Sequence, residues 1–67
     1  MDIRQKLARN LRKLRQLHGW SQEELADEAG LHRTYISDRE RGTRNPSVAV
    51  IEQLCNALSA SAGELLD

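Results

Sequence analysis

Side chains able to perform covalent catalysis or to hold a metal ion are few in this sequence and widely separated. His18, His32 and Cys55 are the only histidine and cysteine residues, whereas a structural zinc site uses about four such ligands at short spacings. Neither these residues nor the carboxylates form a recognisable set of nucleophile, base and orienting group. The sequence therefore predicts a protein that is not an enzyme and that binds no metal and no cofactor.

The length and composition of the chain indicate one small globular domain. Of its 67 residues, 39% are hydrophobic and 30% are charged, which suits a single core, so we expect one domain over residues 1–67. No apolar run approaches the roughly 20 residues of a membrane-spanning helix, and no membrane partner is expected. A single cysteine cannot form an internal disulfide, which is typical of a reducing, cytoplasmic environment.

Helical periodicity is strong and strand signals are weak, so the sequence predicts an all-α fold of five helices. The first helix is expected to end at Gly19, the fourth to begin at Ser47 and the fifth to begin at Ser61, because these residue types favour helix ends. The apolar faces expected on these helices consist of Ile3, Leu7, Leu11 and Leu14 in the first, Val48, Ile51, Leu54, Cys55 and Leu58 in the fourth, and Ala62, Leu65 and Leu66 in the fifth.

Two short helices between these elements form the most informative feature of the sequence. Ser21 and Glu24 have the spacing of a capping box, which begins the second helix, and Gly30 ends it. The third helix is expected from just after His32 to about Arg41. A connection of three residues that includes a glycine makes two such helices cross at a steep angle.

The segments SQEELADEAGL, RTYIS and ERGTRNPS follow one another between residues 21 and 47. Together they resemble the phage-repressor and Cro type of helix-turn-helix domain. XRE-like bacterial regulators belong to this family, and the controller proteins of restriction–modification systems are especially similar across the last two segments. The resemblance covers about residues 7–66. It implies a compact five-helix domain with its helix-turn-helix at about residues 21–41, which binds double-stranded DNA and regulates transcription as a repressor or controller.

The resemblance also implies which side chains read the base sequence. The second helix of the motif lies in the major groove, and its N-terminal residues meet base edges. Arg33 can donate two hydrogen bonds to guanine, which is worth ~1–3 kcal/mol of discrimination, while Thr34 and Ser37 can bond to bases through their hydroxyls. Asp38 either accepts from cytosine or repels phosphates and so acts by exclusion. The expected base-reading residues are therefore Arg33, Thr34, Ser37 and Asp38.

Other residues at the edges of the motif are expected to contact the DNA backbone. Backbone N–H groups at the start of the second helix favour anions, and the resemblance places the loop after the third helix along the phosphates. Such contacts fix the register of the protein on DNA without reading its sequence. The expected phosphate-contacting residues are Ser21, Gln22, Tyr35, Arg44, Asn45 and Ser47.

Several further polar residues have structural interpretations. The basic run from Arg4 to Arg15 is interpreted as a solvated helix face. The resemblance implies a structural ion pair between Arg15 and Glu40. Cys55 is expected in the core as a small apolar residue, and Trp20 is expected at the corner between the first two helices.

Arg39 departs from the family pattern, which has an aliphatic residue at this position. It lies three residues after Ile36, on the same face of the third helix, and an unpaired buried charge costs several kcal/mol. Three arrangements are considered. The guanidinium reaches water over an apolar stem, it pairs with Asp38 or Glu28, or it leaves the helix poorly anchored. We favour the first, and expect that Arg39→Leu raises stability.

The expected partners are double-stranded DNA with a roughly palindromic site and a second copy of the chain. Helices four and five, with Leu65 and Leu66, are the candidate homodimer interface. Acidic residues between Glu23 and Glu28 are interpreted as a solvated face, with docking to a polymerase subunit as the functional alternative. The rival function is an antitoxin-type module that uses the same fold to bind protein, since a fold does not fix a function.

The net charge of zero is the sum of oppositely charged segments. Residues 1–22 carry six basic side chains and one acidic side chain, and residues 23–31 carry four acids and no base. Residues 32–44, which include the third helix, carry four arginines and two acids. A locally positive third helix is compatible with DNA binding. The neutral total predicts weak nonspecific affinity, so that base contacts and dimer geometry carry more of the discrimination.

Overall fold

The computed structural model describes residues 2–67; Met1, the first residue of the expected domain, lies outside the described residues. Within this range the chain forms α1 (Ile3–Leu17), α2 (Gln22–Ala29), α3 (Arg33–Arg41), α4 (Val48–Leu58) and α5 (Ala62–Leu66), and no strand. The all-α prediction with five helices is confirmed. In residues 2–67 no helix has both the length and the apolar character that crossing a bilayer requires.

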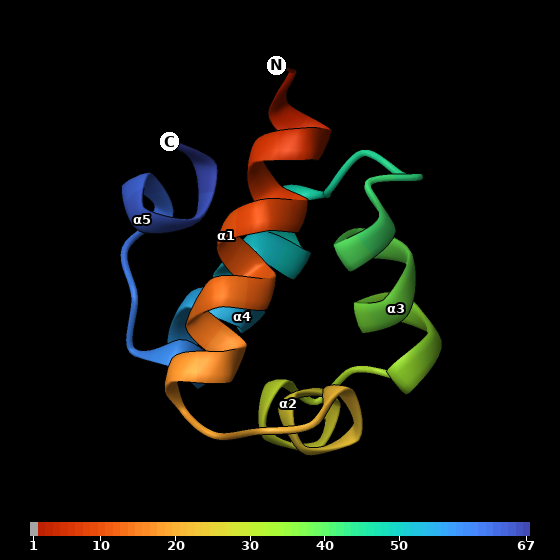
Figure 1. Ribbon diagram of the computed structural model, residues 1–67, viewed down its shortest axis with the longest axis vertical. Helices are drawn as coiled ribbons and strands as arrows, with labels where there is room; N and C mark the ends of the chain where they lie inside the picture. The colour runs from red at the N-terminus through yellow and green to blue at the C-terminus, as the bar shows by residue number, and fades with distance from the viewer. Residues whose placement is uncertain (1) are drawn as a thin grey trace.

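The helices surround one core (Figure 1). The longest of them, α1, packs against α3 on one side and against α5 on the other. The short α2 lies beyond the end of α1 and contacts both α3 and α4, while α4 also contacts α5. Because α1 and α2 both support α3, the outer face of α3 is left to solvent.

Local signals in the sequence set the ends of the helices. The Ser21 hydroxyl accepts from the Glu24 backbone N–H at 3.1 Å, and the Glu24 carboxylate accepts from the Ser21 N–H at 2.9 Å, which completes the expected capping box. Gly30 ends α2 with a φ of 69°, in the left-handed region that glycine adopts at little cost. Ser47 and Ser61 cap α4 and α5 as expected.

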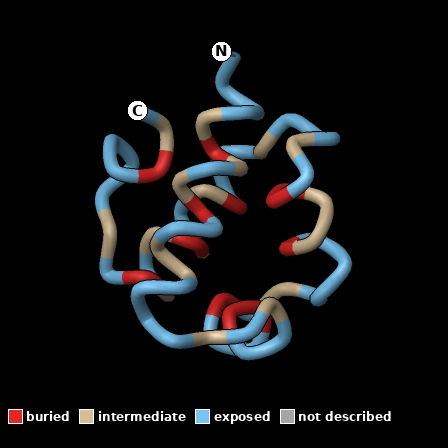
Figure 2. The backbone as a smooth tube through the Cα atoms, viewed as in Figure 1, coloured by how far each residue is buried: buried red, intermediate tan, exposed pale blue. Residues whose placement is uncertain are grey.

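The core is aliphatic and draws on every helix (Figure 2). Trp20 and the half-buried Cys55 pack against it from the outside. Burial, and to a smaller extent the charge of Glu64, raises the pKa of the Cys55 thiol. The buried hydrophobic residues are Leu7, Leu11, Leu25, Ala26, Ala29, Ile36, Val50, Leu54, Leu58 and Leu65.

The prediction that Val48 belongs to the apolar face of α4 is wrong, because this side chain is 85% exposed. The buried residues of α4 are Val50, Leu54 and Leu58, which follow a spacing of four. At about 100° per residue, Val48 lies about 120° around the helix from Leu54. Ile3, at the start of the apolar face of α1, is also 45% exposed.

Candidate nucleic-acid interface

The turn between α2 and α3 brings the two helices into close contact. Gly30 adopts its positive φ, and the Leu31 N–H then donates to the Ala26 carbonyl oxygen at 2.9 Å. Ala26, with 2% of its surface exposed, is small where α2 approaches the rest of the domain. His32 caps the start of α3, and its Nδ1 lies 3.2 Å from the Thr34 backbone nitrogen, which donates to it. This arrangement is a helix-turn-helix.

The two faces of α3 differ sharply in burial. Ile36, Arg39 and Glu40 face inward and are buried. On the opposite side, a hollow of about 180 Å³ is lined by Arg33, Thr34, Ser37 and Arg41. The structure therefore brings three of the four expected base-reading residues onto one accessible surface, and adds Arg41.

The fourth expected base-reading residue, Asp38, is held by arginines. Its carboxylate pairs with Arg41, and its other oxygen lies 3.4 Å from Nε of Arg44. Arg41 also donates to the Ser37 hydroxyl at 2.8 Å. Sequence reasoning missed Arg41, although its spacing of three from Asp38 and four from Ser37 places all three side chains on one helix face.

The start of α2 adjoins the start of α3. A second hollow, of about 310 Å³, is lined by Arg15, Ser21, Gln22, Glu23 and Arg33. Arg33 thus lines both hollows, which joins the expected phosphate contacts of α2 to the base-reading residues of α3.

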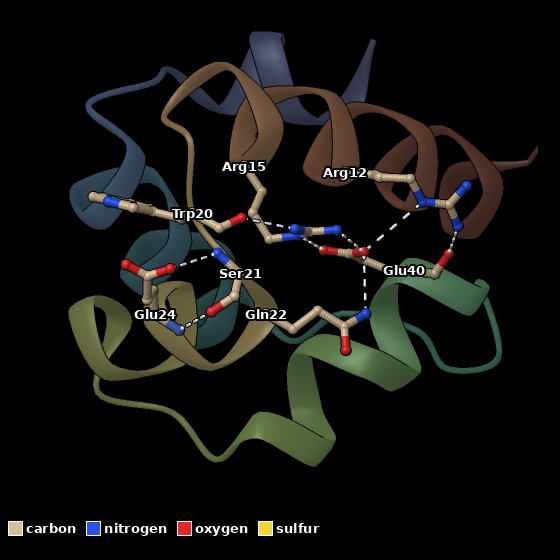
Figure 3. Close-up of polar contacts among 7 residues, drawn as sticks. All are labelled: Arg12, Arg15, Trp20, Ser21, Gln22, Glu24 and Glu40. Atoms are coloured by element: carbon tan, nitrogen blue, oxygen red, sulfur yellow. Dashed lines mark hydrogen bonds and ion pairs between the residues drawn. The ribbon is translucent and has the colours of Figure 1, made fainter.

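A buried ion pair fixes α3 against α1 (Figure 3). As the resemblance implied, Arg15 donates to both carboxylate oxygens of Glu40, from Nε at 2.6 Å and from Nη2 at 3.0 Å. The Gln22 side-chain amide donates to Glu40 at 3.2 Å, and Arg12 donates to the Glu40 carbonyl oxygen at 2.9 Å. Hydrogen bonding to Glu40 raises the pKa of Arg15, outweighing its partial burial. Trp20 lies at the expected corner, and its carbonyl oxygen accepts from Arg15 at 2.8 Å.

The loop between α3 and α4 carries the remaining expected phosphate contacts. Arg44 and Asn45 are exposed, and the Ser47 hydroxyl accepts from the Val50 N–H at 3.2 Å as the cap of α4. Tyr35 of α3 is 44% exposed. The structure thus leaves Arg44, Asn45 and Tyr35 accessible.

The arrangement of Arg39 does not fully match any of the three that the sequence suggested. The residue is 7% exposed, so the favoured arrangement, a guanidinium that reaches water over an apolar stem, is found only to a small extent. The guanidinium carbon lies 4.4 Å from the centre of the Tyr35 ring, a cation–π contact. Among the ion pairs of residues 2–67 none involves Arg39, so pairing with Asp38 or Glu28 is wrong. Its Nε is buried without a hydrogen-bond partner.

Comparison with protein families gives one matching model, described as helix-turn-helix, over residues 11–65. Among curated relatives, control protein C.SmaI of Serratia marcescens is 46% identical over 66 residues, which cover 98% of this chain and 79% of that protein. Control protein C.BamHI of Bacillus amyloliquefaciens is 60% identical over 47 residues, or 70% of this chain and 58% of that protein.

Solved structures of transcription factors and controller proteins are also similar to this chain. A hypothetical transcription factor from Neisseria superposes with a TM-score of 0.93 at 47% identity, covering 98% of this chain and 76% of that one. The restriction–modification controller protein C.AhdI from Aeromonas hydrophila superposes with a TM-score of 0.87 at 44% identity, covering 92% and 94% of the two chains. With its caps, its left-handed turn at Gly30 and the Arg15–Glu40 pair in place, the chain belongs to the XRE-like helix-turn-helix family.

Proposed function

We propose that this protein is a sequence-specific, double-stranded DNA-binding regulator of transcription, of the repressor or controller type, that reads the major groove with α3. The observation that carries the proposal is the hollow lined by Arg33, Thr34, Ser37 and Arg41. Its polar side chains stand on a helix whose inner face is anchored by the core and by Glu40. Such anchoring holds the reading side chains in place before DNA arrives.

Each reading residue has a distinct task in this proposal. Arg33, exposed at the start of α3, donates two hydrogen bonds to a guanine. The Thr34 hydroxyl lies 3.1 Å from Nδ1 of His32, and it exchanges this partner for a base or a water. Ser37 and Asp38 are tied to Arg41, so they act together with it on bases and on the adjoining phosphates.

The phosphate contacts proposed at the edges are of two kinds. At the start of α2, backbone N–H groups and the end of the helix dipole attract an anion, with Ser21 and Gln22 at this position. Side-chain donors come from Tyr35 on α3 and, in the α3–α4 loop, from Arg44, Asn45 and Ser47. These contacts set affinity and register rather than base preference.

A homodimer on a roughly palindromic site is part of the proposal. An apolar groove of about 510 Å³ runs between the ends of α1, α4 and α5 and includes Ile3, Val48, Ile51 and Leu66. The exposure of Ile3 and Val48 there supports burial by a second copy. Leu65 is fully buried in its own core, so it supports this surface from beneath, whereas Leu66 lines it. Two linked half-sites raise affinity through effective concentration.

Two finer parts of the proposal concern location and a protein partner. A cytoplasmic protein is consistent with the single, unpaired Cys55. Docking to a polymerase subunit is assigned to the acidic face of α2, where Glu23, Glu24, Asp27 and Glu28 are all exposed.

The polar outer face of α3 favours DNA over the antitoxin-type alternative, because a protein interface carries apolar or aromatic anchors.

Selection of bound duplexes from random DNA tests the proposal. We expect enrichment of two related half-sites, and Arg33→Gln should lose preference at one base pair in each half-site by about 1–3 kcal/mol. Arg4→Gln is the charge-matched control, since Arg4 is exposed and pairs with Asp2 at the far end of α1. No enrichment, combined with no retention on DNA at low salt, would overturn the proposal.

A further inference from the structure

A second basic surface lies between α1 and the C-terminal end of α3. A hollow of about 340 Å³ there is lined by the cations Arg9, Arg12, Lys13 and Arg41, with the amides of Gln5 and Gln16 among them. We call it the α1–α3 groove. No carboxylate lines it. Ala8 and Gly42 complete the lining, and its polar side chains offer donors to an anion without a competing negative charge.

The helical repeat of α1 creates this surface. Gln5, Arg9, Arg12 and Gln16 recur at spacings of four, three and four, so they share one face of the helix. Asn10 and Leu7 lie off this face, one bonded to the Leu65 carbonyl oxygen and the other fully buried. The basic run of α1 is therefore not distributed evenly around the helix, and half of its cations point into one hollow.

Two cations of the groove are positioned by main-chain oxygen atoms, while Arg41 pairs with Asp38. Arg12 donates to the Glu40 carbonyl oxygen at 2.9 Å, and Arg9 donates to the main-chain oxygen of Asp67, the last residue of the sequence, at 3.3 Å. Arg12 also lies 3.8 Å from the Glu40 carboxylate, but Arg15 already engages both oxygens of that group. These contacts orient Arg9 and Arg12 without adding an acidic side chain to the lining of the groove.

The groove is continuous with the base-reading surface. Arg41 lines both the α1–α3 groove and the hollow that Arg33, Thr34 and Ser37 share. A DNA strand carries one phosphate per ~3.4 Å of helix axis, so a strand that passes Arg41 presents further phosphates to α1. Charge complementarity and this shared residue both select the sugar–phosphate backbone as the occupant.

We propose that the α1–α3 groove binds the phosphate backbone of DNA beside the half-site that α3 reads. The inference rests on the proposed function and assigns to α1 a direct part in it. It replaces the interpretation of the basic run as a merely solvated face for Arg9, Arg12 and Lys13. In this account, α1 increases the length of DNA covered by each copy and adds affinity without adding base preference.

Two double variants of α1 test whether the groove binds DNA. Arg9→Gln with Lys13→Gln removes two cations that line it, and Arg4→Gln with Lys6→Gln removes one arginine and one lysine that do not. Each protein is titrated with its selected duplex at several salt concentrations. The duplex is used both with flanks of about one helical turn and trimmed to the half-sites.

On the flanked duplex we expect the groove variant to bind about tenfold more weakly at 0.1 M salt, with the slope of log K against log salt smaller by about 1.8, since each lost phosphate contact removes about 0.9. Base preference should stay unchanged. The difference from wild type should shrink on the trimmed duplex, and the control variant should lose much less.

Equal affinity and equal salt slope for the two double variants would overturn the proposal that the groove binds DNA, while leaving the proposed function intact. That result would also be the outcome if the groove takes an acidic protein instead of DNA. A wild-type protein without any sequence preference would instead overturn the proposed function. If Arg9→Gln disturbs folding, Lys13→Gln alone decides the matter, since the structure gives Lys13 no hydrogen bond among residues 2–67. Its expected loss is about half as large in slope.

Discussion

Two clusters of one acid with arginines occur on α3, only two residues apart, and they differ in burial. The Glu40 side chain is 3% exposed and Arg15, which it binds, is 14% exposed. The Asp38 side chain is 15% exposed, but its partners Arg41 and Arg44 are 58% and 69% exposed. The same residue types therefore form a closed cluster on the inner face of the helix and an open cluster on the outer face.

The physical consequence of this difference is large. Water and salt screen the open cluster, so its ion pairs contribute ~0–1 kcal/mol and can be exchanged for others. The closed cluster is poorly screened, and removal of one partner leaves a buried charge without compensation. We infer that Glu40 fixes the position of α3, whereas Asp38 controls how readily Arg41 and Arg44 meet phosphate.

Replacement of the buried acid should give the largest effect. Glu40→Gln leaves the Arg15 guanidinium without its carboxylate, and we expect a loss of about 3–5 kcal/mol in the free energy of unfolding, most of the stability of so small a domain. Urea unfolding followed by circular dichroism measures it. Arg12→Gln is the control, because that side chain is 55% exposed and should cost under about 1 kcal/mol. Equal losses for the two variants would contradict the distinction between closed and open clusters.

Arg39 of α3 extends the comparison, because it is buried without an acidic partner. Arg39→Leu removes a buried Nε that has no hydrogen-bond partner, and an unsatisfied buried donor costs ~1–3 kcal/mol. Part of this gain is offset by loss of the contact with Tyr35, so we expect the free energy of unfolding to rise by about 1–2 kcal/mol. The thermal midpoint should then rise by roughly 4–8 °C per kcal/mol.

Arg39→Lys serves as the comparison for that experiment. It keeps a buried cation without restoring a partner, so it should not raise the midpoint. An unchanged or lower midpoint for Arg39→Leu would show that the Tyr35 contact outweighs the unsatisfied nitrogen.

Breaking the ion pairs of the open cluster should have the smallest effect on stability and a measurable effect on DNA affinity. Asp38→Asn should change the free energy of unfolding by less than about 1 kcal/mol. Because it releases Arg41 and Arg44, we expect nonspecific DNA binding to become several-fold tighter and the salt slope to steepen by up to about 1.8. Titration of a random-sequence duplex measures both. Glu52→Gln makes the same change in net charge from an exposed position on α4, and Asp38→Asn must exceed it for the interpretation to hold.

Local features of the sequence were sufficient to predict the elements. The helix ends at Ser21, Gly30 and Ser47 depend on interactions within three or four residues, which the sequence displays directly. The pair of Arg15 and Glu40, 25 residues apart, was available only through the family resemblance, because periodicity says nothing about which helices meet.

Features that depend on the packing of several helices were predicted less well. The ring of Tyr35 covers Arg39 because both lie on one side of α3, where the choice of rotamer decides the contact. The exposure of Val48 follows from how α4 is rotated against the core, which a spacing of three or four does not determine. Arg41 was missed since its importance comes from the surface that it shares with α1.

Trp20 offers a practical consequence of the way that α1 meets α2. It is the only tryptophan in the sequence, its ring stacks on His18 with centroids 4.4 Å apart, and its carbonyl oxygen is held by Arg15. Tryptophan fluorescence of this protein therefore originates from a single indole at the joint that the Arg15–Glu40 pair secures. Its emission spectrum is an intrinsic optical probe of whether that joint is closed, and no label needs to be attached.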